Sequence, residues 1–115
     1  MAAPRMTGAM HDVLALLLEA WNEKREPHGW LIMKSLRRSG PAVYSALDRL
    51  EDKGWITGTW EVLPEGERRA RRRYYRLTAT GVEAARSAVA ESQRATPQLR
   101  PQPGFGMVLR PSLTG

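Results

Sequence analysis

The stretch SGPAVYSALDRLEDKGWITGTW, residues 39–60, combines a helix start, a helical period, a helix stop and the beginning of a strand. Ser39 is suited to cap a helix, and Pro41 suits its first turn because proline has a helical φ and no N–H is needed there. Gly54 favours a stop at the carboxyl end. The apolar residues at the helical spacing of one buried face are Val43, Ala46, Leu47 and Leu50. The stretch therefore predicts a helix over 41–53, entered through a tight turn and followed by β structure.

Two strands are expected directly after this helix. Residues 55–63 (WITGTWEVL) and 72–77 (RRYYRL) are rich in the β-branched and aromatic residues that favour strands. The segment between them is polar and contains Pro64 and Gly66. Because these residues are typical of turns, the sequence predicts a hairpin with an exposed tip.

Arginine accumulates at this hairpin. Residues 68–76 contain six Arg and no acidic residue, and six equals the formal net charge of the whole chain, +6. Arginine stays ionised and can pair with phosphate through two hydrogen bonds, so the run indicates an edge that binds a polyanion. A solvated charged loop is the alternative that composition leaves open.

Two further helices are predicted before the turn. Thr7 can cap a helix that begins near Gly8. The core-facing stripe of this first helix is Met10, Val13, Leu14, Leu17 and Trp21. Pro27 can occupy the first turn of a second helix that runs to about Arg38. The residues of the second helix that can face the core are Ile32 and Leu36.

A fourth helix is expected from Thr78, as its cap, to about Gln93, with small residues along one side. The first helix carries an apolar arc wider than one core contact requires. In a short chain the spare faces of these two helices most simply meet a second copy, which predicts a homodimer. The residues assigned to this contact are Val13, Leu16, Ala20, Val82, Ala85 and Val89. The alternative is a first helix surrounded by its own domain.

The chain of 115 residues has room for one core, and the expected fold class is α+β, mainly α. Residues 7–78 are predicted to form the compact domain and residues 79–93 the dimerisation helix. Residues 94–115 contain four Pro and no helical or strand period, so they are predicted to be a flexible Pro/Gly-rich tail.

Several kinds of chemistry find no support. The chain has no Cys, so it has no disulfide, thiolate zinc site or cysteine nucleophile. His11 and His28 are isolated, and no paired carboxylates or metal-ligand spacing occurs, so neither an enzyme nor a metal or other cofactor is expected. The longest apolar run, residues 13–18, is far shorter than the roughly 20 residues of a bilayer span, and no signal pattern is seen. A cytoplasmic protein without a membrane partner is expected.

The order helix, helix, tight turn, helix and basic hairpin is that of a winged helix-turn-helix module, which reads nucleic acid through its third helix. Three stretches, PHGWLIMKSL (27–36), GPAVYSALDRLEDKGWI (40–56) and RRRYYRLTATG (71–81), closely resemble the PadR family of bacterial transcriptional regulators. The resemblance covers about residues 10–89. The matched positions before the hairpin are His28, Gly29, Trp30, Val43, Tyr44, Leu47, Leu50 and Gly54.

This resemblance implies a winged helix-turn-helix domain with a carboxy-terminal dimerisation helix, in the short class of the family. It implies a homodimer that binds double-stranded DNA as a sequence-specific regulator, typically a repressor on an inverted-repeat operator. Ser45 stands where the family frequently has Pro, and Ser39-Gly40-Pro41 replaces a common Ser-Pro-Gly, so base preference is expected to differ. Residues 82–93 contain no aromatic ring to stack on a flat ligand, and the sequence identifies no small-molecule effector.

The residues predicted to contact DNA lie off the buried stripe of the third helix and on the wing. They are Ser39, Pro41, Ala42, Tyr44, Ser45, Arg49 and Lys53 for base edges and phosphates, and Arg71, Arg72 and Arg73 for phosphates or the minor groove. Tyr44 has an alternative role, locking its helix to the body of the domain.

Two interpretations remain open at this point. The four Trp are assigned to packing in the core or the hairpin, with a ligand cage as the alternative. The alternative to DNA recognition is a winged-helix adaptor that binds proteins, which would show an apolar patch in place of the arginines and the polar helix face.

Overall fold

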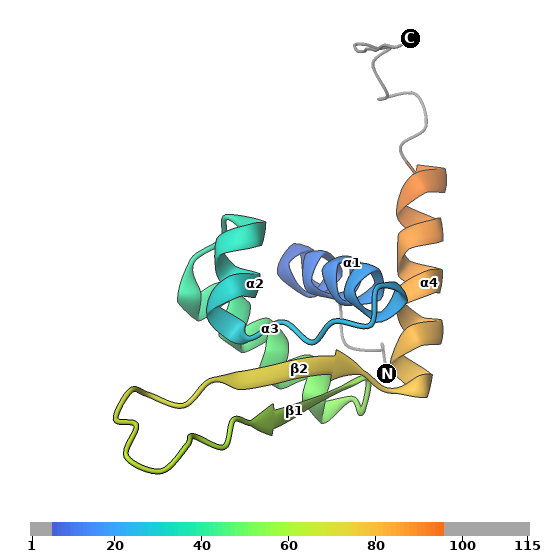
Figure 1. Ribbon diagram of the computed structural model, residues 1–115. Helices are drawn as coiled ribbons and strands as arrows, with labels where there is room; N and C mark the ends of the chain where they lie inside the picture. Colours follow the sequence, from blue (N-terminus) through green and yellow to red (C-terminus); the bar gives the residue numbers. More distant parts are fainter. Residues whose placement is uncertain (1–5, 96–115) are drawn as a thin grey trace, which may run out of the picture.

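Four helices and one two-stranded antiparallel sheet make up residues 6–95, the part of the chain that the computed structural model describes (Figure 1). In chain order they are α1 (Gly8–Asn22), α2 (Gly29–Leu36), α3 (Gly40–Asp52), β1 (Ile56–Trp60), β2 (Arg73–Leu77) and α4 (Ala79–Ala95). The α+β, mainly helical class is therefore confirmed. The hairpin loop extends away from the helices at one end, and α4 stands at the opposite end.

Hydroxyl side chains begin three of the helices as the sequence predicts. Thr7 Oγ1 accepts the N–H of Met10 at 3.1 Å, and Ser39 Oγ accepts that of Ala42 at 3.3 Å. Thr78 Oγ1 accepts the N–H of Gly81 at 3.0 Å. Each cap satisfies an N–H group that has no partner within the helix, so local sequence is enough to set these helix starts.

The start and end of α2 differ from the prediction. His28 is the N-cap, with Nδ1 accepting the N–H of Leu31 at 3.4 Å, and Pro27 lies outside the helix. The Pro27 carbonyl instead accepts the N–H of Tyr75 at 2.9 Å, and His28 bridges to Tyr74. The segment before α2 therefore continues the sheet beside β2, which explains why proline does not enter the helix. At the other end the left-handed φ of Arg37, 56°, stops α2 at Leu36.

The core forms where α1, α3, α4 and the sheet meet. The predicted stripes are buried on α3, and on α1 all but Trp21 are buried. Trp21 is 41% exposed, so its assignment to the core is wrong; it lies in the last turn of α1, where Ala20 faces the core instead. Ile32 is fully buried and Leu36 is half-buried.

Helix α4 packs along α1 of the same chain. The Nε2 atom of His11 lies 3.1 Å from the Ala88 carbonyl oxygen. Four of the six residues predicted for a dimer contact are buried inside this single chain: Val13, Ala20, Val82 and Ala85. The interpretation that Ala20 is left over from the core is therefore wrong, because Ala20 is 1% exposed within this single chain. Leu16 and Val89 remain partly exposed.

The sheet is shorter than predicted, because only residues 56–60 and 73–77 pair, from Ile56 opposite Leu77 to Trp60 opposite Arg73. The loop 61–72 joins them. Helix α4 ends two residues later than expected, and the rest of the predicted tail, residues 96–115, lies outside the described residues. Within residues 6–95, no helix is both long and apolar enough to cross a bilayer.

Candidate nucleic-acid interface

The exposed face of α3 carries hydroxyl, guanidinium and carboxylate groups. Burial of its apolar stripe leaves Pro41, Ser45 and Arg49 exposed on the opposite side, where the sequence places them. Asp48 and Asp52 share this exposed face, and the prediction missed both, although their helical spacing from Ser45 shows it. Hydroxyl and guanidinium groups can donate to base edges, and a carboxylate can accept from the amino group of cytosine. The face can therefore make hydrogen bonds of both polarities.

The remaining predicted residues of α3 lie at its two ends and its flanks. Ser39 is the exposed cap and Ala42 is half-buried. Lys53, the C-cap, holds its ammonium 5.0 Å from the ring centre of Trp55, so part of its surface is already used within the chain.

Tyr44 packs against the first residue of α2. A Cβ atom added to Gly29 would lie 2.6 Å from the Tyr44 hydroxyl oxygen and within 2.9 Å of two ring carbons. The ring therefore occupies the space that a side chain at position 29 would need. This contact supports the locking role of Tyr44, although 45% of its surface stays exposed.

Two of the arginines in the 68–76 run donate hydrogen bonds to carboxylates, and a third, Arg76, lies 3.8 Å from Glu26. Arg69 donates to Glu61 at 2.5 and 2.8 Å and to Glu67 at 3.0 Å. These hydrogen bonds from Arg69 lower the pKa of the Glu61 carboxyl to about 2. Glu61 is therefore ionised at neutral pH and pairs with Arg69. Arg73 donates to Glu51 of α3 at 2.6 Å, and that bond raises the pKa of Arg73.

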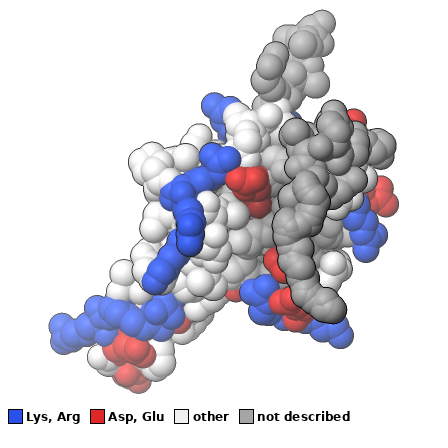
Figure 2. All heavy atoms as spheres, turned by 90° about the horizontal axis from the view of Figure 1, so that it is seen from above, with Lys and Arg blue, Asp and Glu red and all other residues white. Residues whose placement is uncertain are grey.

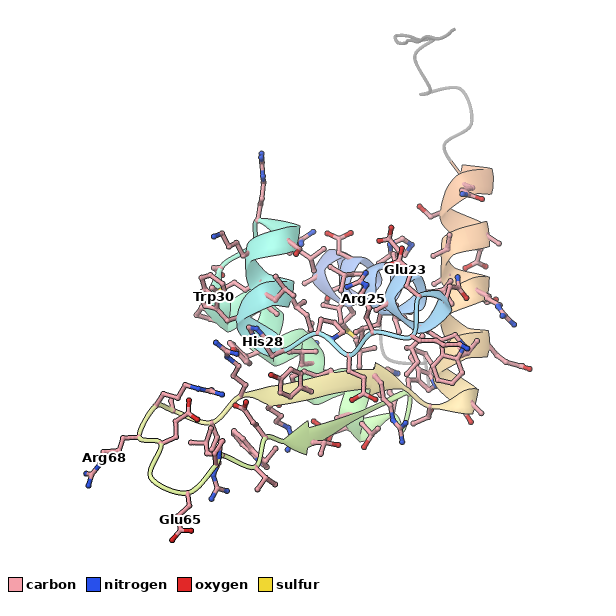
Figure 3. The ribbon with its side chains drawn as sticks, viewed as in Figure 1. Glu23, Arg25, His28, Trp30, Glu65 and Arg68 are labelled. Carbon is pink, nitrogen blue, oxygen red and sulfur yellow. The ribbon has the colours of Figure 1, made fainter. Side chains whose placement is uncertain are left out.

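This pairing changes the prediction for Arg73. Arg73 was expected to meet phosphates or the minor groove, but its guanidinium is turned toward α3 and bound there. Arg68, Arg71 and Arg72 are exposed and have no ion pair among the described residues. Arg68 points outward from the loop tip in Figure 3, and Figure 2 shows basic side chains gathered at this projecting end, beside acidic ones. Within the described part of the chain, these three are therefore the free arginines of the wing.

A cleft of about 610 Å³ separates the wing from the start of α2 and the flank of α3. Its lining residues include Trp30, Trp60, Tyr44, Asp48, Arg71 and Arg72. Trp30 and Trp60 are 53% and 56% exposed, so neither is a core residue; Trp60 packs within the hairpin against Arg73, and both rings flank this cleft. Because wing arginines and residues of the outer α3 surface border the same cleft, both belong to one face of the molecule.

His28 links α2 to the wing within this cleft. Its ring stacks on Trp30, with centroids 6.3 Å apart, and meets the ring of Tyr74 edge-on at 5.7 Å. Figure 3 shows His28 and Trp30 together at the start of α2, above the sheet. Partial burial and the positive charge of Arg72 both lower the pKa of His28, which favours the neutral ring needed for its capping contact.

A helix-turn-helix followed by a hairpin with free arginines defines a winged-helix protein. The chain belongs to the PadR-like family of transcriptional regulators, since the family model matches residues 17–87. This finding confirms the resemblance drawn from the sequence. Members of the family are DNA-binding regulators and are not enzymes.

Solved structures agree with this assignment. A PadR family transcription regulator from hypervirulent Clostridium difficile R20291 has a TM-score of 0.60 at 25% identity, covering 80% of this chain and 94% of that chain. The circadian clock associated protein Pex from Anabaena has a TM-score of 0.58 at 28% identity, covering 78% of each chain.

A third similarity concerns the fold alone. ZitR from Lactococcus lactis has a TM-score of 0.62 at 20% identity, and the match covers 81% of this chain but 63% of ZitR, less than two thirds of its length. No curated protein matches the sequence.

Proposed function

We propose that this chain is a sequence-specific regulator that binds double-stranded DNA as a homodimer and represses transcription from an inverted-repeat operator. The observation that carries the proposal is the single face on which the outer surface of α3 and two free arginines of the wing, Arg71 and Arg72, border one cleft. Family membership supports the same use of this face. A bacterial regulator of this kind works in the cytoplasm, where its DNA is.

In this proposal α3 enters the major groove, and the wing follows the backbone. Ser45 and Arg49 lie one helical turn apart on the exposed side and reach base edges, where arginine can pair with guanine through two bonds. Ser39 and Pro41, at the start of α3, lie nearest the phosphates, which favour helix N-termini. Arg71 and Arg72 neutralise phosphates on the wing side.

Replacing Arg71 and Arg72 together by alanine is expected to make DNA binding less sensitive to salt. Each phosphate contact contributes about −0.9 to the slope of log affinity against log salt, so the slope should flatten by that amount for every arginine that contacts a phosphate. Binding to random and operator DNA is measured by fluorescence anisotropy from about 50 to 200 mM salt.

Arg76→Ala is the matched control for this experiment. Arg76 carries the same charge on β2, but it lies 3.8 Å from Glu26 and borders a different hollow with Trp21 and Lys24. Its replacement should leave the slope unchanged. An unchanged slope in the Arg71 and Arg72 variant would show that the wing does not contact the backbone.

The dimer contact is proposed on the second half of α4. In Figure 1 this half extends beyond α1. Val89 lies in this half, one turn after Ala85, and is half-exposed. Leu16 faces α2 instead and borders a hollow with Leu31 and Leu36.

A Val89→Glu variant is therefore expected to be monomeric at micromolar concentration, because dimerisation would bury an unpaired carboxylate. Sedimentation equilibrium measures the mass, and circular dichroism checks that the variant is folded. Ser87→Glu adds the same charge on the exposed side of α4 and should remain dimeric. A folded Val89→Glu dimer would place the interface elsewhere, with Leu16→Glu as the next test.

The exposed rings of Trp30 and Trp60 favour the adaptor as the second candidate function. They give the cleft apolar surface of the kind found at protein contacts. The two functions separate in the salt titration, since an adaptor would show no salt-dependent affinity for DNA in the unmodified protein.

A further inference from the structure

We propose that Arg73 and Glu51 form a lock that fixes the wing at a set angle to α3, and that Arg73 acts as a positioning residue without touching DNA. The inference rests on the DNA binding proposed above. It implies that Glu51, although acidic, strengthens the binding of DNA. It also gives the arginines of the wing two different roles. Arg71 and Arg72 contact phosphate, while the next residue along the chain holds them in place.

The lock joins the first residue of β2 to the last full turn of α3. The Arg73 Nη2 atom donates to Glu51 Oε2 at 2.6 Å across 22 residues of sequence. The two side chains are 26% and 30% exposed, so the pair is partly shielded from water. Such shielding strengthens a charged hydrogen bond relative to one on an open surface.

Strand β1 is shaped to let the Arg73 guanidinium pass. A Cβ atom added to Gly58 would lie 2.5 Å from Arg73 Nε and 2.8 Å from both Cζ and Nη2. The Arg73 Cζ atom also lies 5.3 Å from the ring centre of Trp60 and 5.7 Å from that of Tyr75. Arg73 thus contacts α3 and both strands. The lack of a side chain at Gly58 leaves the space that its guanidinium occupies.

The wing is too small to keep a fixed orientation without contacts to the rest of the domain. A two-stranded hairpin is marginally stable by itself in water, and here it has only five residues in each strand. Arg71 and Arg72 lie immediately before Arg73, so the direction of β2 at this residue decides where they reach. A wing already held in the binding position loses little conformational entropy on contact with DNA, and this raises affinity.

The lock predicts that Glu51→Gln lowers the affinity for DNA, whereas the loss of a negative charge alone would raise it. Removing a negative charge near DNA should by itself strengthen binding. Loss of the lock should weaken DNA binding instead. If the wing is in the binding position only about one-tenth of the time, Kd should rise about tenfold. The salt slope should not change, because every phosphate contact is kept.

Glu65→Gln is the matched control for charge. Glu65 lies in the wing loop, is exposed and has no ion pair among residues 6–95. Its replacement should leave affinity unchanged or increase it. If Glu51→Gln also binds DNA as tightly as the unmodified protein or more tightly, the lock is disproved.

Variants of Arg73 and Gly58 separate positioning from contact. Arg73→Ala should weaken binding with an unchanged salt slope, whereas Arg72→Ala should flatten the slope by about 0.9 for each phosphate contact that it removes. The double variant of Glu51→Gln and Arg73→Ala should bind no worse than either alone, since both remove one interaction. Gly58→Ala keeps every charge but displaces the guanidinium, so it should resemble Glu51→Gln.

Hydrogen exchange in the free protein tests the lock without DNA. The strand amides of residues 57–60 and 73–76 should exchange faster in Glu51→Gln and Arg73→Ala than in Glu65→Gln, because the wing opens more often. If the unmodified protein does not bind DNA, the proposed function is refuted. The hydrogen-exchange measurement would still test the lock, because it uses the free protein. Unchanged wing exchange in both lock variants, or a flatter salt slope in Arg73→Ala, would overturn the inference.

Discussion

Replacing Gly81 with alanine is expected to lower the free energy of unfolding by about 3 kcal/mol, the upper range for forcing extra atoms into a packed site. An added Cβ atom would overlap the carbonyl oxygen of Trp55 and lie 2.7 Å from its carbonyl carbon. These are backbone atoms, so no side-chain rotation relieves the clash. The same carbonyl oxygen accepts the N–H of Thr78 at 2.9 Å.

Hydrogen bonds on both sides of Thr78 prevent the start of α4 from moving away from Trp55. The Thr78 hydroxyl donates to the Gly54 carbonyl at 2.7 Å and accepts the N–H of Gly81. Separating α4 from the segment before β1 would therefore break the two hydrogen bonds that Thr78, the N-cap of α4, donates to Gly54 and Trp55. Glycine at position 81 therefore permits the close approach between these two backbone segments.

Urea unfolding followed by circular dichroism measures the effect, and Gly8→Ala is the matched control. Gly8 begins α1, and the only close neighbour of an added Cβ there, among the described residues, is the end of the flexible Arg38 side chain, at 3.2 Å. Alanine favours a helix over glycine, so Gly8→Ala should be neutral or stabilising by up to about 1 kcal/mol. A Gly81→Ala protein as stable as Gly8→Ala would show that α4 does not approach Trp55 as closely as described.

Replacing Arg49 with alanine is expected to cost roughly 1 to 3 kcal/mol of binding free energy in each half-site, if the guanidinium pairs with guanine through two bonds. Arg49 is exposed on α3 and makes no side-chain bond within residues 6–95, so it is free to reach a base. A dimer would place two such helices in successive major grooves about 34 Å apart. The loss should therefore appear at one base position in each half of an inverted repeat.

Footprinting on operators with single base changes in the half-sites measures this specificity. The Arg49→Ala protein should lose its discrimination at that one position and keep it elsewhere. Lys53→Ala is the comparison, because a lysine stacked on Trp55 can serve phosphate only as a point charge, and its loss should weaken all sequences equally. A uniform loss for Arg49→Ala would reassign Arg49 to phosphate.

Several features were predictable from the sequence because they depend on neighbours along the chain. The caps Thr7, Ser39 and Thr78 each act on an N–H group three residues later, and the buried stripe of α3 repeats at the period of one helix. The order of elements and the family also followed from local patterns and motifs.

Predictions failed where a distant segment overrides a local preference. Pro27 suits the first turn of a helix, but its carbonyl is held by Tyr75, which makes the segment extended. Ala20 and Trp21 are adjacent and both apolar, and only the packing of the folded chain around the end of α1 decides that Ala20 is buried while Trp21 is 41% exposed.

Six arginines gather at one hairpin because they are close together in the sequence, and their number equals the net charge of the chain. Which of them are free depends on the folded structure. Ion pairing depends on the distance between charged atoms, and folding brings Glu61 to Arg69 across the loop and Glu51 to Arg73 from another helix. Charge can therefore be counted along the chain, but its availability to a ligand is fixed by contacts between residues that are far apart in sequence.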